Sequence, residues 1–159
     1  MMVEIRTLLA AIDFSDMSSL VLDYTYSLAT AYKARVLAVH VVYDLSYFTG
    51  IYHADASLPA LQQRLEAEAH ERLEGFCQSA FGREVPYEAL VVTGRPLAEI
   101  SRLVQEQTVD CLVLGAHSMD KPEHQLFGST AERLLHYILC PVFVVPPRKS
   151  SEFVLQGKF

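Results

Sequence analysis

Two short segments near the end of the chain have residue types suited to binding an anion. An apolar run ends at Gly115, and Ser118 comes shortly after it. Nine further residues separate Ser118 from the segment Gly128, Ser129 and Thr130. The first turn of a helix has backbone N–H groups without intrahelical partners and lies at the positive end of the helix dipole, so phosphate binds there readily. We therefore predict a phosphate site between a strand that ends at Gly115 and a helix that begins at Gly128.

Glycine and hydroxyl residues would contribute to this site in different ways. Gly115 and Gly128 permit a positive φ and a close approach of the backbone to phosphate oxygens. The hydroxyls of Ser129 and Thr130, with nearby N–H groups, can donate hydrogen bonds to those oxygens. The alternative is purely structural, because glycines often end strands and begin helices without any ligand.

The elements that would position these residues alternate between apolar runs and helical patterns, which is typical of βα units and a mainly parallel sheet covered on both faces. The apolar runs are rich in Val, Ile and Leu without strict alternation, so each strand should be buried on both sides. The chain is therefore predicted to form a doubly wound α/β fold. The expected strands are Thr7–Ile12, Val36–Val42, Tyr87–Val92, Cys111–Gly115 and Val142–Val145.

Four helices are expected between these strands. The first covers Met17–Tyr32, and Ser15 or Asp16 could cap its start. The second is longer and ends at Gly82. The apolar positions that mark the second, third and fourth helices are Leu58, Leu61, Leu65, Ala69, Leu73 and Phe76; Leu97, Ile100 and Val104; and Ala131, Leu134, Leu135 and Ile138.

Length and composition limit the class of protein. A chain of 159 residues is long enough for one domain with a well-buried core, and 51% hydrophobic with 20% charged residues is normal for a globular protein. The formal net charge of -6 argues against general attraction to nucleic acid or to anionic membranes, because both need a basic field. We expect no nucleic-acid and no membrane partner, so any phosphate site must be local.

The cysteines and the start of the chain indicate a cytoplasmic protein. Cys77, Cys111 and Cys140 are widely spaced, so neither a zinc site nor a disulfide framework is indicated. The first apolar run is broken by Asp13 and is too short for a signal peptide or a membrane span. A reducing cytoplasm fits both observations.

The order of these segments resembles the universal stress protein family, over essentially the whole chain up to about Arg148. The segments that carry the resemblance are LLAAIDFSDMSS, VLAVHVV, VVTGRPLAEI, and DCLVLGAHS followed by FGSTAERLLHYILCPVFVV. The resemblance implies a single Rossmann-like domain over residues 1–147 and a tail over residues 148–159. It further implies a five-stranded parallel sheet of strand order 3-2-1-4-5 and a homodimer that forms through the last strand.

The resemblance also implies which residues bind a nucleotide. Members that bind nucleotides use a Gly-x2-Gly-x9-Gly-Ser/Thr pattern for the phosphates, and a first-strand Asp and a second-strand Val for ribose and adenine. These roles transfer to Asp13, Val41, Gly115, Gly128 and Ser129. Such positions meet in the crevice where the strand order reverses, at the carboxyl ends of the strands. The alternative for Asp13 is that it merely caps the following helix.

Ser118 departs from the family pattern, which has its second glycine at this position. If the backbone must be left-handed here, the serine Cβ costs about 1 kcal/mol, which is equivalent to several-fold in affinity. This cost would weaken phosphate binding without preventing it. The serine hydroxyl can also donate a hydrogen bond to a phosphate oxygen.

Histidines and an aromatic loop leave further alternatives open. His117 and His124 could approach phosphates or hold a metal, but no ligand spacing supports a metal site. His40 and His136 are expected to be packing or surface residues. The loop over residues 43–57 is rich in aromatic side chains, which either stack on a nucleotide base or bury themselves against a helix or a partner subunit.

These observations lead to two main functional hypotheses. The first is a cytoplasmic, dimeric stress or signalling module that binds an adenine nucleotide, with ATP, with or without Mg²⁺, as the expected ligand. The second is a family member that has lost nucleotide binding and acts through dimerisation and protein partners, which Ser118 favours. An ATP-using enzyme is not indicated, because the chain lacks the phosphate loops that position a reactive phosphate and lacks a nucleophile with a paired base.

Overall fold

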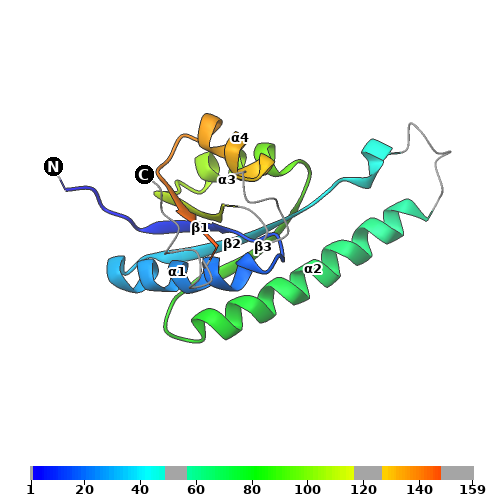
Figure 1. Ribbon diagram of the computed structural model, residues 1–159. Helices are drawn as coiled ribbons and strands as arrows, with labels where there is room; N and C mark the ends of the chain where they lie inside the picture. Colours follow the sequence, from blue (N-terminus) through cyan, green and yellow to red (C-terminus); the bar gives the residue numbers. More distant parts are fainter. Residues whose placement is uncertain (1, 49–56, 117–126, 148–159) are drawn as a thin grey trace, which may run out of the picture.

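The structure is a computed structural model, and it describes residues 2–48, 57–116 and 127–147. The described residues form a central sheet with helices on both faces (Figure 1). In chain order the elements are β1 (Thr7–Ala11), α1 (Met17–Tyr32), β2 (Arg35–Val42), the 3-10 helix η1 (Leu45–Phe48), α2 (Leu58–Phe81), β3 (Tyr87–Thr93), α3 (Pro96–Glu106), β4 (Cys111–Gly115), α4 (Ser129–Tyr137) and β5 (Val142–Val145).

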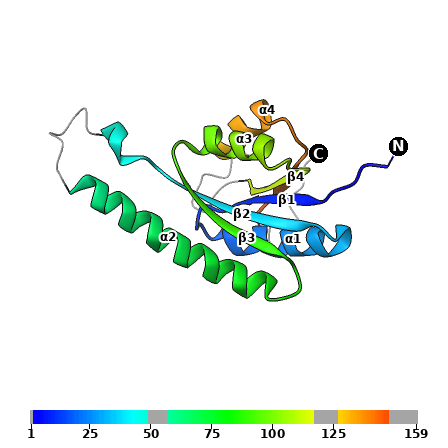
Figure 2. The same ribbon diagram turned by 180° about the vertical axis from the view of Figure 1, so that it is seen from behind.

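The sheet is parallel throughout and has the order β3-β2-β1-β4-β5, which confirms the predicted topology. α1 and α2 cover one face, and α3 and α4 cover the other (Figures 1 and 2). The chain proceeds from β1 outward to β2 and β3, and then returns to the other side of β1 with β4. The strand order therefore reverses between β1 and β4, where an open α/β sheet leaves a crevice.

Each strand contributes to two hydrophobic cores because successive side chains point to opposite faces. In β2, Val36 and Ala38 pack in the core with α1 and α2, whereas Leu37 and Val39 pack in the core with α3 and α4. The central strands β1, β2 and β4 are thus buried on both sides, as predicted, whereas β3 and β5 at the two edges of the sheet are mostly half-buried. The position of a residue along its strand therefore determines which face of the sheet its side chain occupies. It also determines from which face that side chain reaches the crevice.

The predicted bounds agree with the structure to within about a residue at most strands, with one informative difference. β1 ends at Ala11 rather than Ile12. Ile12 N still donates to Val39 O at 2.8 Å. The carbonyl oxygen of Ile12, however, is hydrogen-bonded to the ring of His40, whose Nδ1 lies 2.7 Å away. A side chain thereby replaces the next backbone partner and ends the strand pairing.

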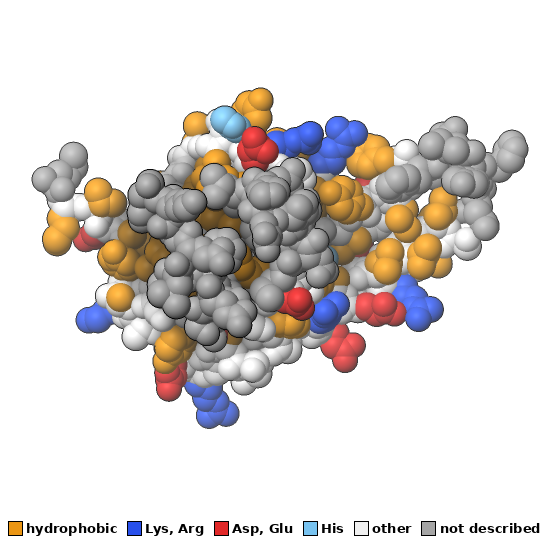
Figure 3. Space-filling model, viewed as in Figure 1, with side chains coloured by type: hydrophobic (Ala, Val, Ile, Leu, Met, Phe, Trp, Pro, Cys, Tyr) orange, Lys and Arg blue, Asp and Glu red, His pale blue; other side chains and the backbone are white. Residues whose placement is uncertain are grey.

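α2 differs from the expected uniform amphipathic helix. Its buried residues are Ala69, Leu73, Cys77 and Phe81, so only its second half packs on the sheet. The first half projects beyond the sheet (Figure 1), where Leu61 is 45% exposed. Hydrophobic side chains gather over this projecting part in Figure 3.

Polar groups attach the projecting half of α2 to the rest of the fold. Gln62 Oε1 accepts from Leu45 N at 3.0 Å, and Glu66 Oε1 accepts from Thr93 Oγ1 at 2.6 Å. Gln62 Nε2 also donates to Glu66 Oε1 at 3.0 Å, which joins the two contacts into one network. Most of the aromatic loop and the expected tail lie outside the described residues.

Candidate functional site

A cavity of about 400 Å³ lies at the carboxyl ends of the central strands, where the strand order reverses. Its volume falls in the range of small-molecule sites. Its apolar wall comes mainly from the α3/α4 face, and its polar lining comes from the β1–α1 turn and the start of α4. The apolar lining includes Val39, Val41, Ile100, Leu114 and Leu134, and the polar lining includes Asp13, Ser15, Ser18 and Thr130.

The structure brings most of the predicted binding residues together. Asp13, Val41, Gly115 and Thr130 all line this cavity, although they come from four different segments of the chain. Gly128 and Ser129 precede Thr130 directly, as the N-cap and first residue of α4. Ser118 lies outside the described residues. Contacts of these residues with a ligand remain predictions.

Asp13 organises the β1–α1 turn and keeps part of its carboxylate available. Its Oδ1 accepts from Ser15 N at 2.9 Å and from Ser18 Oγ at 3.3 Å. Its Oδ2 has no hydrogen bond to any described residue, and the side chain is exposed in the cavity lining. The N-cap position of α1 belongs to Asp16, which makes no side-chain cap hydrogen bond. Asp13 therefore both stabilises the turn and leaves an acceptor facing the cavity.

The backbone of Val41 is open toward the cavity because β1 has ended beside it. In a parallel ladder, alternate residues direct their N–H and C=O groups to the same neighbouring strand. Val39 O faces β1, where it accepts from Ile12 N, so Val41 directs its polar groups to that side too. No hydrogen bond joins them to another described residue. The half-buried side chain of Val41 packs on the α3/α4 face, so backbone and side chain both border the same space.

Neither glycine of the predicted phosphate site has the positive φ that glycine permits. Gly128 has φ -71° and ψ 160°, which any residue adopts, and the positive-φ glycines of the described chain are Gly82 and Gly94. A Cβ at Gly115 would lie 3.3 Å from Met17 Cβ, so this glycine permits close packing of β4 against α1. Close packing against α1, rather than a positive φ, is therefore the physical reason for Gly115.

The start of α4 offers unpaired donors beside the cavity. Gly128 N donates to Ala116 O at 2.8 Å, which joins the two ends of the β4–α4 connection, and Glu132 N donates to Gly128 O at 2.9 Å. The amides of Ser129, Thr130 and Ala131 donate to no residue within the described ranges. Unpaired first-turn amides at the positive end of a helix dipole attract anions.

Comparison with known proteins gives one family for the whole described region. The family model described as the Universal stress protein family matches residues 4–146. The chain belongs to the universal stress protein family. Universal stress protein YxiE of Bacillus subtilis is 29% identical over 143 residues, which cover 87% of this chain and 97% of YxiE. Universal stress protein MJ0531 of Methanocaldococcus jannaschii is 30% identical over 139 residues, which cover 87% of this chain and 81% of MJ0531.

Solved structures share the fold. That of the hypothetical protein MJ0577 has a TM-score of 0.80 and 22% identity, and the match covers 93% of this chain and all of MJ0577. A universal stress protein from Archaeoglobus fulgidus in complex with dAMP has a TM-score of 0.61 and 19% identity, with coverage of 90% and 98%. A universal stress protein in complex with cAMP has a TM-score of 0.59 and 20% identity, with coverage of 91% and 98%.

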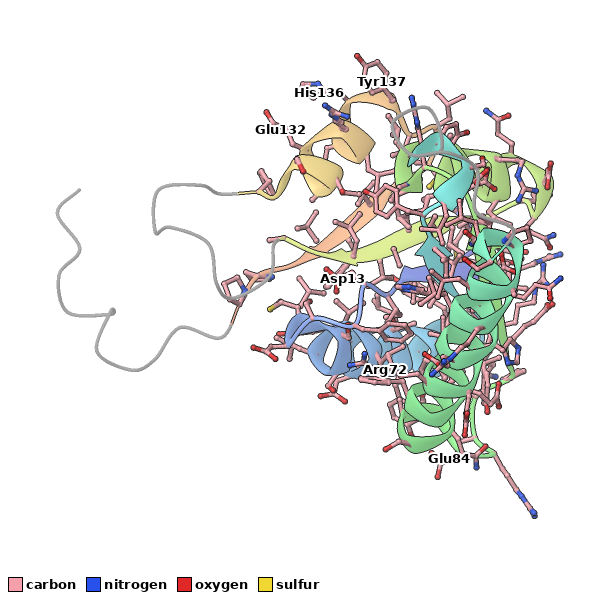
Figure 4. All side chains as sticks on the ribbon, turned by 90° about the vertical axis from the view of Figure 1, so that its right-hand side faces the viewer. Asp13, Arg72, Glu84, Glu132, His136 and Tyr137 are labelled. Atoms are coloured by element: carbon pink, nitrogen blue, oxygen red, sulfur yellow. The ribbon has the colours of Figure 1, made fainter. Side chains whose placement is uncertain are left out.

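The charges around the cavity of this universal stress protein are few. Its described lining residues include Asp13 and His40 but no Lys or Arg, so attraction of an anion depends on backbone donors. Burial lowers the pKa of His40 below its ordinary value, which favours the neutral ring. On α4, Glu132, His136 and Tyr137 point away from the body of the molecule (Figure 4).

No helix among the described residues is both long and apolar enough to cross a membrane.

Sequence reasoning missed a contribution from residues next to the predicted ones. Phe14, which follows Asp13, has φ 61° and stacks on His40 with the ring centroids 4.1 Å apart. No local sequence signal indicates this arrangement, because aromatic residues seldom adopt a left-handed backbone. His40 was expected to be a packing or surface residue, and it is packed, but it also lines the cavity.

Proposed function

We propose that this universal stress protein binds an adenine nucleotide, ATP foremost, in the cavity between β1 and β4. The observation that carries this proposal is the meeting of three complementary groups around one space of about 400 Å³. These groups are the open carboxylate of Asp13, the open backbone of Val41 and the unpaired amides that begin α4. The cavity thus offers an acceptor, a hydrogen-bonding edge and donors to one ligand.

Each group suits one part of a nucleotide. Asp13 Oδ2 would accept hydrogen bonds from ribose hydroxyls, and the backbone of Val41 would pair with the adenine edge while apolar side chains cover the ring. The amides and hydroxyls of Ser129 and Thr130, with Gly128 before them, would donate to the phosphates. Mg²⁺ that accompanies ATP would be held mainly by phosphates and water. The described residues contain no group of three His, Cys, Asp or Glu side chains that could hold a metal.

The ligands of related structures support an adenine compound. The complexes of universal stress proteins with dAMP and with cAMP share the adenine base and differ in sugar and phosphate. We infer that the present chain shares this preference for adenine. We propose that the bound nucleotide acts as a regulatory signal in the cytoplasm rather than as a substrate for dedicated turnover.

We also propose that two copies associate through β5. This strand lies at the edge of the sheet, so its outer backbone groups have no partner strand among the described residues. An open edge is a template for pairing with another chain, and a two-fold axis would pair identical strands. Phe143 is half-buried on β5 and contacts Tyr24 of α1, with ring centroids 5.7 Å apart. These rings would extend the contact beyond the strand.

The second candidate function is a nucleotide-free member that acts through dimerisation and protein partners. Two observations favour it. Ser118 replaces the second glycine of the family pattern, and the described lining of the cavity provides no Lys or Arg to neutralise phosphate charge. Such a protein would retain the fold and the edge strand while its cavity stays without nucleotide.

A direct experiment separates the two functions. Freshly purified protein is denatured and removed, and the supernatant is analysed for adenine nucleotides by absorbance and chromatography. Calorimetric titration with ATP follows, with GTP as the control for the base. Release or saturable binding of an adenine nucleotide supports the proposal. Absence of bound nucleotide together with no heat of ATP binding contradicts it and leaves the partner-binding function.

A further inference from the structure

The β1–α1 turn is built around one residue with an unusual backbone. Phe14 has φ 61°, in the left-handed region that non-glycine residues seldom adopt. Its neighbours Asp13 and Ser15 line the cavity, whereas the Phe14 side chain packs in the core on the α1/α2 face. The left-handed conformation therefore lets the polar residues on either side of Phe14 face the cavity while the aromatic side chain points away from it.

Phe14 is held between side chains from two other elements. Its ring stacks on that of His40 from β2, with centroids 4.1 Å apart and an interplanar angle of 28°. The guanidinium carbon of Arg72, which extends from α2 under the turn (Figure 4), lies 4.5 Å from the Phe14 ring centroid. Phe76 adds a tilted contact at 5.9 Å. We call Arg72, Phe14 and His40 the Arg-Phe-His stack.

The stack fixes the chain on both sides of Asp13. His40 Nδ1 lies 2.7 Å from the carbonyl oxygen of Ile12, and because a carbonyl only accepts, Nδ1 carries the proton and donates. His40 therefore holds Ile12, which precedes Asp13, by a hydrogen bond and holds Phe14, which follows it, by ring stacking. A residue in a sparsely populated conformation persists when its surroundings determine it in this way.

Arg72 contributes to this arrangement rather than to a surface ion pair. Its side chain is exposed, yet it forms no salt bridge with a described residue, and its ring contacts are with Phe14 and Phe76 at 4.5 and 6.0 Å. Arg64, two turns earlier on the same helix, is exposed too but pairs with Glu68 at 2.8 Å. Arg64 is thus a matched arginine without a role in the turn.

We propose that the Arg-Phe-His stack is a positioning device that aims the Asp13 carboxylate at the sugar hydroxyls of the nucleotide, so that the stack sets the preference for ribose. This inference rests on the proposed function. A carboxylate that accepts from both the 2′ and 3′ hydroxyls must hold a narrow orientation, because hydrogen bonds weaken steeply when they are misaligned. The two anchors around Asp13 supply that orientation by holding the chain on either side of the carboxylate.

The test compares two ligands by calorimetry: ATP and 2′,3′-dideoxy-ATP, which lacks both hydroxyls. The parent protein should bind ATP about tenfold or more tightly than the dideoxy analogue, since two hydrogen bonds to a carboxylate are lost. Phe14→Ala should reduce this ratio to about twofold, with the affinity for the dideoxy analogue nearly unchanged. Phe14→Tyr, which keeps the ring, should preserve the ratio.

Two variants at exposed positions and a double-mutant cycle show whether a change in the affinity ratio comes from the stack or from misfolding. Arg72→Ala alters only an exposed side chain and should lower the ratio in the same direction, whereas Arg64→Ala should leave it unchanged. In the background of Asp13→Ala, Phe14→Ala should cause no further loss of the ratio, because the two changes act through one carboxylate.

Three other outcomes would contradict the inference. If Phe14→Ala weakens both ligands equally, or leaves the ratio intact, the stack is only structural and the inference fails while nucleotide binding stands. If the parent binds both ligands with equal affinity, the assignment of Asp13 to the sugar fails as well. If the parent binds neither ligand, the proposed function itself is wrong and this inference is overturned with it.

Discussion

The two βα connections that border the cavity differ in how their polar groups are satisfied. In the β1–α1 turn, Asp13 Oδ1 accepts from Ser15 N and Ser18 Oγ, and Ser15 Oγ accepts from Met17 N at 3.3 Å. At the start of α4, the first-turn amides donate to no described residue. The first connection is completed by its own side chains and presents an acceptor, whereas the second presents donors. One ligand with hydroxyls and a negative charge would therefore complement both connections.

The substitution with the largest expected effect tests the backbone donors at the start of α4. Gly128→Val should abolish ATP binding, with at least about a hundredfold loss, because a branched side chain would enter the space assigned to the phosphates. The backbone at Gly128 has φ -71° and ψ 160°, which valine adopts without strain, so the fold should survive. Calorimetry measures the affinity and circular dichroism checks the fold. A variant that binds ATP as tightly as the parent would show that this end of α4 is not the phosphate site.

Asp13→Ala tests the acceptor side and should have a smaller effect on binding with an added effect on stability. We expect about a tenfold loss of ATP affinity together with about 1 kcal/mol of lost unfolding free energy, because the hydrogen bonds to Ser15 and Ser18 disappear. Urea unfolding measures the second quantity. Thr130→Ala is the control from the donor side, since it should weaken ATP binding with little change in stability. Equal stability losses in both variants would contradict the contrast between the two connections.

Ser118→Gly sharpens the comparison by restoring the family pattern in the sequence of the β4–α4 connection. We expect ATP affinity to rise about fivefold, because the family pattern has glycine here and, if binding requires a left-handed backbone, a Cβ costs about 1 kcal/mol that glycine avoids. Titration of the variant beside the parent measures the change. An unchanged affinity would mean that the serine is harmless to binding.

The smallest expected effect concerns His40, which anchors the acceptor side. Burial lowers its pKa below the ordinary 6.5, with a hydrogen bond to Ile12 and the charge of Asp13 acting against the shift and the charge of Arg72 acting with it. A depressed folded-state pKa contributes stability that is present above pH 6.5 and is lost as the pH falls through the lowered value. Urea midpoints at pH 7.5 and 5.5 should therefore differ more in the parent than in His40→Asn. Equal differences would assign the pH dependence to other groups.

The fold could be predicted from the sequence because the apolar runs are continuous and the helices between them have clear spacing. Cys111–Gly115 and Val142–Val145 form strands with the expected bounds, and each contributes side chains to both hydrophobic cores. α2 was less predictable. Its apolar positions repeat from Leu58 onward, but the sheet reaches only the second half of the helix.

The candidate site could be predicted in its residues but not in its supporting contacts. Asp13, Val41, Gly115 and Thr130 were expected at one site, and they line one cavity, because parallel strands bring their carboxyl ends to the same edge. The Arg-Phe-His stack had no such signal. It depends on tertiary contacts between β2, α2 and a turn, and its central residue adopts a backbone that its type disfavours.

The two halves of α2 have different consequences for motion. Its second half is fixed by buried residues such as Leu73 and Phe81, whereas its first half is attached by the network of Gln62 and Glu66. Segments with few buried apolar contacts open locally at low free energy. Amide hydrogens in the first half should therefore exchange with solvent sooner than those in the second. The helix can fray from its beginning while Arg72, in the anchored half, stays under the turn that carries Asp13.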